Sequence, residues 1–408
     1  MRNWCILISY CGAAFINGVA WVTLIPISDK AMDYYNINDA ELTMYSYSYA
    51  LASVPLAPIS AWIISKSFFA TLHIVWTLNL MGCWLRYIAH SNFLISFSGQ
   101  LSIALGNMLM LSSCSTLASL WFPPSQILFA TSIASTANFI GMSLGFAYMP
   151  YCDSISTMML IQAIISSILF AFNLLVLKKD HKHKIFIPFK ESFILSLKDK
   201  ILVGLTLSAG SGLAVNYALI SILGLLLESE NYSSVQTGWT GFTFLASGLL
   251  GALIATYMAE VKKATKGPLM IILVSALISS IVFAGILSFR YYSLPAVAFY
   301  GASITGFLPL SIRYCVEFAP TIDESVITNM IFFSAQVFSC IYTFPIQYWK
   351  AETKITGFWI ASVLILLSFG ILFMLVAKFS RPSINNLDKE NLDINCSQSP
   401  DFQNKSNS

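Results

Sequence analysis

The sequence is poor in charged residues, because Asp, Glu, Lys and Arg make up only 10% of its 408 residues. Soluble globular proteins carry about 25% charged residues. The share of apolar residues is 57%, against roughly 45–50% in soluble proteins. A soluble protein of this composition would have no surface left to face water. We therefore predict an integral membrane protein.

Residue patterns typical of enzymes are also missing. The four histidines, His73, His90, His181 and His183, form no HExxH-type pattern, and no Walker phosphate-binding loop occurs. The eight cysteines have no CxxC spacing and mostly fall inside apolar runs, which predicts neither a metal site nor a disulfide framework. We expect a protein that is not an enzyme, has no cofactor and does not bind nucleic acid.

Apolar runs long enough to cross a bilayer recur along the chain. A spanning helix needs about 20 apolar residues. We place twelve spans at residues 4–28, 42–65, 68–89, 93–120, 126–149, 157–177, 201–227, 236–258, 268–289, 294–318, 325–348 and 355–378. Pro55 and Pro58 are expected to break the second span, and residues 121–125 (WFPPS) separate the fourth span from the fifth. The polar loop 29–41 and the tail 381–408, which we expect to be disordered, lie outside the spans.

A basic stretch at residues 178–200 separates two apolar halves and holds seven of the 22 Lys and Arg residues. Lys and Arg in short loops stay on the cytoplasmic side of a membrane. If this hinge loop is cytoplasmic, alternation of the spans places sixteen basic residues inside and four outside. We therefore expect both termini in the cytoplasm, and we favour the plasma membrane. Arg86, at the end of the third span, is expected to extend to the membrane interface.

The two halves resemble each other. Residues 121–125 (WFPPS) resemble residues 317–321 (EFAPT), and a lone amide follows each motif, Asn138 in the fifth span and Gln336 in the eleventh. The fold predicted is all-α, with twelve transmembrane helices in two pseudo-symmetric six-helix bundles, residues 1–177 and 201–380. Parallel repeats of this kind place the substrate site near the membrane midplane, between the halves.

Polar side chains inside the spans are candidate functional residues. Asn17 in the first span should face the bundle interior. The alternative for Asn17, Asn138 and Gln336 is that they bond neighbouring helices to one another. Arg313 and Glu317 lie four residues apart on one helix, so they are expected to pair. Charges inside a span usually mark a water-lined path or a gate, and we favour a gate.

Several segments resemble a known family. The arrangement of two halves with six spans each is that of the major facilitator superfamily. The feline leukaemia virus subgroup C receptor family of transporters is the one that these segments resemble most specifically: 17–21 (NGVAW), 49–56 (YALASVPL), 117–122 (LASLWF), 141–146 (GMSLGF), 305–310 (TGFLPL), 316–318 (VEF) and 334–338 (SAQVF).

The resemblance implies a carrier of choline or ethanolamine that works by alternating access, with haem export also attributed to the family. It implies an aromatic cage containing Trp21 and a glutamine at Gln336. Where the family has a glutamine after Asn138, this chain has Phe139. The family's tyrosine of the seventh span falls on Asn216 or, with one inserted residue, on Tyr217.

Two charged positions of the family also differ. Arg313 stands where the family usually has an acidic residue. The superfamily's acidic lock between spans 2 and 3 is replaced by Ser65. Its counterpart between spans 8 and 9 is kept as Glu260, followed by Lys262.

The chemistry of a quaternary ammonium agrees with the resemblance, because such a group has no hydrogen-bond donor and is held best by aromatic faces. We predict a site made by Trp21, Asn17, Asn138, Phe139, Tyr217 and Gln336. The alternatives are an aromatic-belt position for Trp21 and simple packing for Tyr217 and Phe139. A carrier of another solute, such as haem, and a receptor or sensor that transports nothing stay open. The partners expected are a small-molecule substrate and the lipid bilayer, with the protein a monomer.

Overall fold

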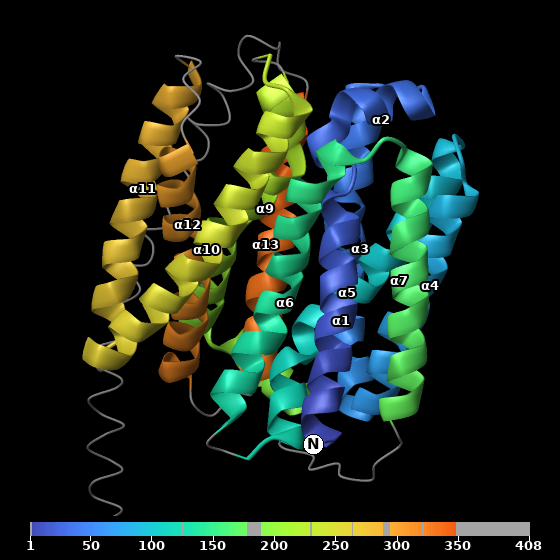
Figure 1. Cartoon of the computed structure of the whole chain (residues 1–408). Coiled ribbons are helices and arrows are strands. Elements are labelled where there is room, and N and C mark those ends of the chain that lie inside the picture. Colours follow the sequence, from blue (N-terminus) through green and yellow to red (C-terminus); the bar gives the residue numbers. More distant parts are fainter. Residues whose placement is uncertain are drawn as a thin grey trace, which may run out of the picture.

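The structure is a computed structural model that describes residues 2–123, 126–177, 189–228, 231–262, 264–288, 294–319, 322 and 324–347. Within these ranges the chain is almost entirely helical (Figure 1). The helices are α1 (Arg2–Val22), η1 (Ile25–Ile27), α2 (Ser28–Tyr35), α3 (Asp39–Lys66), α4 (Phe68–Ile88), α5 (Phe93–Trp121), α6 (Ile127–Tyr148), η3 (Met149–Tyr151), α7 (Ile155–Val176), α8 (Phe189–Lys198), α9 (Lys200–Glu228), α10 (Ser234–Lys262), α11 (Lys266–Ser288), α12 (Leu294–Phe318) and α13 (Glu324–Gln347).

The long helices match the predicted spans. Each of the first eleven predicted spans corresponds to one long helix of the described ranges, from α1 to α13. Nine segments among the described residues are long and apolar enough to cross a membrane. The twelfth predicted span, 355–378, the tail 381–408 and the first part of the hinge, 178–188, lie outside the described residues.

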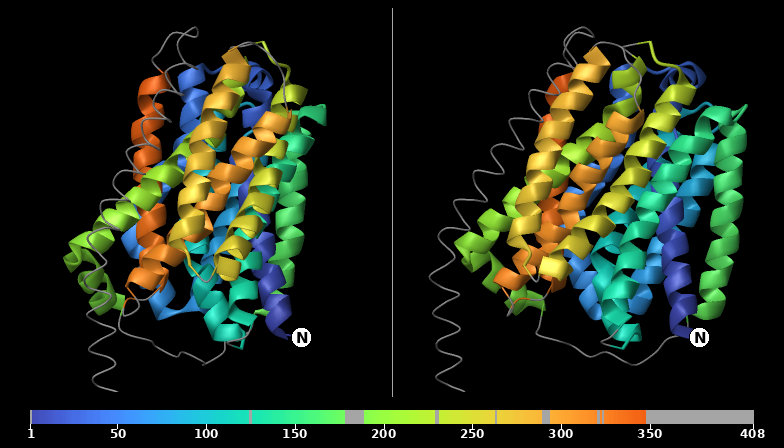
Figure 2. Two further views of the ribbon diagram at one scale, coloured as in Figure 1. Left: turned by 90° about the vertical axis from the view of Figure 1, so that its left-hand side faces the viewer. Right: turned by 60° about the vertical axis from the view of Figure 1, so that its left-hand side comes forward.

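The two halves repeat one packing scheme. In the first half α1 packs against α6 and α3 against α5, and in the second half α9 packs against α13 and α10 against α12. The halves stand next to each other and meet where α6 packs against α10 and α3 against α13 (Figures 1 and 2). This arrangement confirms the predicted fold of two pseudo-symmetric helical bundles.

Glycine allows the closest of these contacts. A Cβ atom on Gly18 of α1 would lie 2.2 Å from the carbonyl oxygen of Asn138 in α6, and one on Gly141 of α6 would lie 2.2 Å from the carbonyl oxygen of Phe15. Small residues let helix backbones approach closely where lipid provides no hydrophobic drive for association. The glycines therefore join α1 and α6 into one packed unit.

We expect Gly18→Ala to lower the stability of the protein by about 1–3 kcal/mol, because the added methyl group must push α6 away from α1. Gly285→Ala is the matched control, because Gly285 also lies in a helix and a Cβ atom there meets nothing within 4 Å. Thermal unfolding of the two purified variants measures the difference. Equal melting temperatures would show that the α1–α6 contact adjusts freely.

Three local predictions differ from the structure. Part of the loop expected at 29–41 forms α2, which ends at Asn36 with a φ of 52°. The second span does not break, because α3 runs from Asp39 to Lys66 through Pro55 and Pro58. Neighbouring helices re-satisfy the backbone groups that proline frees in a membrane helix. The last part of the predicted hinge loop, residues 189–198, forms α8.

Arg86 does not extend to the interface as predicted. Its side chain is 1% exposed in the last turn of α4, and its guanidinium carbon lies 6.0 Å from the centre of the Tyr45 ring. Nearby, Tyr35 at the end of α2 bonds Ser96 of α5. Helix α2, which the sequence did not predict, thus contributes to the surroundings that bury Arg86.

Candidate functional site

An aromatic cluster, defined as Trp21, Tyr49 and Tyr217, lies where the two halves meet. Trp21 of α1 stacks on Tyr49 of α3, with ring centres 4.9 Å apart and an angle of 10° between the rings. Tyr217 of α9 meets Trp21 edge-on, with ring centres 5.5 Å apart. All three side chains are at most 3% exposed. This is not the position of an aromatic-belt residue, and the cluster draws on both halves.

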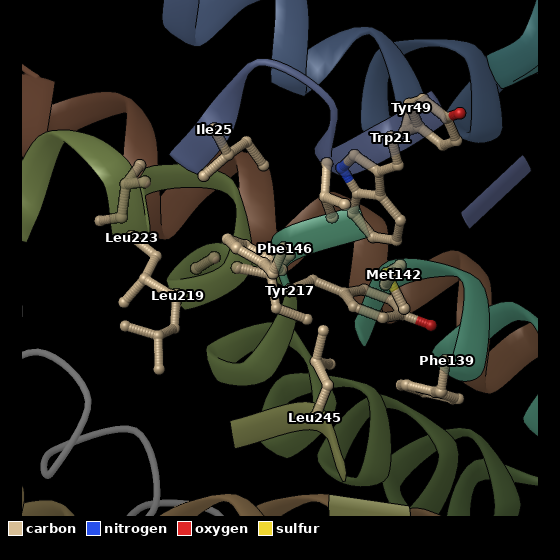
Figure 3. Close-up of a cluster of buried hydrophobic side chains, with 14 of the residues drawn as sticks. Trp21, Ile25, Tyr49, Phe139, Met142, Phe146, Tyr217, Leu219, Leu223 and Leu245 are labelled. Atoms are coloured by element: carbon tan, nitrogen blue, oxygen red, sulfur yellow. The ribbon is translucent and has the colours of Figure 1, made fainter. Parts of the chain in front are cut away.

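Phe139 and Met142 of α6 belong to the same buried group as the aromatic cluster. Figure 3 shows Tyr217 below Trp21, with its hydroxyl group on the side of Met142 and Phe139. Phe139 is 9% exposed. The position where the family has a glutamine is therefore an apolar wall near the Tyr217 hydroxyl group.

Two of the predicted amides bond neighbouring helices. The Asn17 Nδ2 atom donates to Asn79 Oδ1 of α4 at 3.1 Å and to the carbonyl oxygen of Ile103 in α5 at 3.0 Å. The Asn138 Nδ2 atom donates to the carbonyl oxygen of Ala14 in α1 at 3.1 Å. Both amide nitrogens therefore bond neighbouring helices of the first half to one another, which is the alternative stated for them above.

Asn216 occupies a place in the second half that matches Asn17 in the first. Its Nδ2 atom lies 3.3 Å from the Thr305 Oγ1 atom of α12, which is the counterpart of α5. The next residue, Tyr217, contacts Trp21 instead. Of the two candidates for the aromatic position of the seventh span, Tyr217 is the one at the boundary between the halves.

Gln336 lies on the face of α13 that is directed at the first half. Asn329, seven residues earlier and hence about two helical turns away on the same face, donates to the carbonyl oxygen of Ala57 in α3. Gln336 is 1% exposed, and its Nε2 atom has no hydrogen-bond partner among the described residues. This donor is available for a ligand between the halves.

Sequence reasoning missed two buried residues that carry polar groups. Tyr49 provides a face of the aromatic cluster and donates its hydroxyl to the carbonyl oxygen of Asn17 at 2.9 Å. Asn107 of α5 is fully buried, and neither its Oδ1 nor its Nδ2 atom has a partner in the described part of the chain. The polar character of Asn107 within an apolar span was the only available signal.

The halves touch at the end of the molecule that carries α2 (Figure 1). A Cβ atom on Gly224 of α9 would lie 2.0 Å from the carbonyl oxygen of Ile25 in η1. The Ser28 hydroxyl donates to Glu228 Oε2 at 2.7 Å, and Trp239 Nε1 of α10 donates to the Tyr151 hydroxyl of η3 at 3.0 Å. We call this set of contacts the α2-end latch.

The halves also touch nearer the opposite end. Besides its bond to Ala57, Asn329 accepts a hydrogen bond from the Ser112 hydroxyl of α5 at 3.2 Å. One amide of α13 therefore joins α3 and α5 of the first half. We call this second set the α8-end latch, because α8 contacts α3 and α13 as well.

Arg313 and Glu317 form the expected ion pair, with 2.9 Å between Arg313 Nε and Glu317 Oε1. The Thr265 hydroxyl lies 2.8 Å and 2.7 Å from the two carboxylate oxygens of Glu317. Glu317, at the end of α12, therefore accepts a hydrogen bond from the residue directly before α11 and stabilises the contact between the two helix ends. Glu260 and Lys262 are exposed on the last turn of α10, and a locking role for them stays a prediction.

We expect Glu317→Ala to reduce stability and transport more than Arg313→Ala does. Without Glu317, the buried Thr265 hydroxyl loses its hydrogen-bond acceptor. Without Arg313, the Glu317 carboxylate keeps its hydrogen bond from Thr265 and can also bond water. Because the pair is 39% and 48% exposed, its own contribution should be about 0–1 kcal/mol. Melting temperatures and uptake rates of the two variants measure the order. A larger loss for Arg313→Ala would mean that the charge pair itself is the gate.

The chain is similar to known transporters over most of its length. The sequence profile of the Major Facilitator Superfamily matches residues 10–343. The choline/ethanolamine transporter FLVCR2 of Rattus norvegicus is 23% identical over 372 residues, covering 84% of this chain and 68% of the relative. The human FLVCR2 protein is also 23% identical, covering 84% and 71%.

Solved structures agree on the fold. A D-xylose-proton symporter superposes with a TM-score of 0.72 at 10% identity, covering 90% of this chain and 97% of the other. A bacterial homologue of the human lysosomal transporter Spinster, in an inward-facing and unoccupied conformation, superposes with a TM-score of 0.58 at 13% identity. The coverage is 93% of this chain and 96% of that structure. The chain is a multi-pass membrane transporter that belongs to the major facilitator superfamily and resembles its FLVCR members.

Proposed function

We propose that the protein carries small organic cations of the choline and ethanolamine type across the membrane by alternating access. The aromatic cluster is the observation that carries this proposal, because Trp21 and Tyr49 come from one half and Tyr217 from the other. A ligand held by these rings would contact both halves at once. Its binding would then favour one relative position of the halves over another.

The cluster suits a cation without requiring a carboxylate. Aromatic faces attract an ammonium group through the ring quadrupole, and Trp attracts it most strongly. In this structure Trp21 and Tyr217 pack against one another across the boundary between the halves, so a slight separation of the halves opens the contact between these two rings to a cation. The Gln336 Nε2 donor and the Tyr217 hydroxyl are candidates to bond the hydroxyl end of choline, with Phe139 on the wall near the Tyr217 hydroxyl.

The two latches support the alternating-access part of the proposal. The α2-end latch and the α8-end latch join the same two bundles at different levels, on either side of the aromatic cluster. A path from one side to the site requires one latch to open while the other stays closed. The family relatives that bear the name choline/ethanolamine transporter favour this class of substrate.

Uptake into liposomes reconstituted with the purified protein tests the proposal. Labelled choline, ethanolamine, haem and a neutral amino acid are compared, and the melting temperature is measured with each compound. Saturable uptake of choline or ethanolamine supports the proposal. A melting temperature that rises with choline but no uptake would indicate a receptor or sensor, and uptake of haem alone would indicate the other substrate class.

We further propose that the α8 end faces the cytoplasm, with both termini on that side, in the plasma membrane. The exposed side chains of Asp33 in α2 and Lys262 in α10 lie on opposite sides in this arrangement. In intact cells, an impermeant thiol reagent should label Asp33→Cys from outside, and Lys262→Cys only after permeabilisation. Labelling of the parent protein, which has only its own cysteines, measures the background. The reverse labelling pattern would overturn the orientation.

A further inference from the structure

Arg86 is a buried cation that the proposed transport cycle does not use. Its side chain is 1% exposed in the last turn of α4. None of its three guanidinium nitrogens has a hydrogen-bond partner among the described residues. Taking a charge out of water without a partner is costly, and buried charges in proteins are normally paired. The position therefore calls for an acceptor.

The surroundings of Arg86 are fixed by close packing. A Cβ atom on Gly99 of α5 would lie 2.9 Å from the Arg86 Cγ atom and 3.0 Å from its backbone nitrogen. Only a residue without a side chain lets α5 pass this close to the stem of the arginine. Tyr45 of α3 lies 6.0 Å from the guanidinium carbon. A ring at this distance attracts the charge but accepts no N–H hydrogen bond along the guanidinium edge.

Three hydroxyl groups beside the guanidinium add a further donor. Ser96 Oγ lies 3.0 Å from the Tyr35 hydroxyl and 3.2 Å from the Tyr45 hydroxyl, and both tyrosines interact electrostatically with Arg86. Three hydroxyl groups hold three protons, whereas the two bonds between them use two. One O–H group therefore remains to donate outward, in the surroundings of a guanidinium whose three nitrogens have no hydrogen-bond partner among the described residues.

We propose that Arg86, together with the hydroxyls of Tyr35, Tyr45 and Ser96, binds a small monovalent anion such as chloride. The guanidinium supplies the charge and several N–H donors, and the hydroxyl group supplies another. Arg86 is 1% exposed and closely packed against Gly99, so the ligand inferred here is a monatomic ion rather than an organic acid. Because Tyr35 ends α2 and Ser28 begins it, the anion would hold α2 in place next to the α2-end latch.

The melting temperature of the full-length protein in chloride tests the proposal. The protein is purified in sodium gluconate, and chloride replaces gluconate at constant ionic strength. We expect a saturable rise of about 2 °C or more in the melting temperature, because a ligand that binds only the folded state stabilises it. Arg86→Gln should abolish the rise. Arg313→Gln, which removes the arginine of the exposed ion pair, should keep it.

Ser96→Ala provides a milder variant in case Arg86→Gln does not fold. Losing one hydrogen bond should raise the half-saturating chloride concentration about threefold to tenfold. Crystals grown in bromide should show an anomalous peak beside Arg86. The proposal would be overturned if chloride left the melting temperature of the wild type unchanged. It would equally be overturned if Arg86→Gln or Ser96→Ala kept the wild-type response to chloride, or if the bromide crystals showed no peak beside Arg86.

Discussion

Trp21→Ala is expected to weaken binding of choline about thirtyfold, because a desolvated cation–π contact is worth roughly 2 kcal/mol. The replacement removes the ring that both Tyr49 and Tyr217 contact. The affinity is measured as the half-saturating concentration for uptake into liposomes and, independently, from the rise in melting temperature with choline.

Trp21→Phe should keep part of the affinity, because phenylalanine retains an aromatic face with a weaker quadrupole. Trp62→Ala is the matched control, since Trp62 is 57% exposed on α3 and lies away from the cluster. Unchanged choline affinity in Trp21→Ala, with the variant folded, would show that the aromatic cluster is packing and not the cation site.

Cross-linking of Ser28→Cys to Glu228→Cys is expected to stop transport almost completely. The two native side chains bond directly at 2.7 Å across the α2-end latch. A short bifunctional thiol reagent would tie η1 and α2 to α9. The site would then stay closed at this end, whatever substrate is present. Initial uptake rates before and after treatment measure the loss, which reductive cleavage of the linker should reverse.

Each single cysteine variant treated with the same reagent is the control, because it carries one reactive thiol of the pair on the same background. If the cross-linked double variant still transports at the untreated rate, the α2-end latch does not open during the cycle. That result would leave the aromatic cluster unaffected but would contradict the alternating-access part of the proposal.

Helix positions could be predicted from the sequence because a membrane imposes them through length and composition. Long apolar runs and the interruption at Pro123 located the ends of α5 and α6 within a few residues. Helix α2 escaped prediction because it is short and polar, with eight residues. The prediction that Pro55 and Pro58 break the second span was wrong, because the effect of proline on a membrane helix depends on whether neighbouring groups bond the backbone atoms that it frees.

The site could be predicted only in part, because it depends on how the helices pack against one another. Resemblance to a family pointed to Trp21, but the stacking partner Tyr49 lies on another helix and depends on how α1 packs against α3. Asn17 shows the same limit. A lone amide in an apolar helix signals an interior position, but only the structure shows that its donor bonds Asn79 and Ile103. Arg86 was misplaced because its burial depends on how α3 and α5 pack against α4.

The polar atoms without partners also bear on how long the carrier rests in this state. The Trp21 indole N–H and the Gln336 Nε2 atom are both buried, and neither has a partner among the described residues. Each such donor costs about 1–3 kcal/mol, so the conformation with both latches closed is less stable than its packing alone would make it. In the proposed transport cycle, donors left without acceptors keep this closed conformation from becoming a trap and so favour rapid turnover.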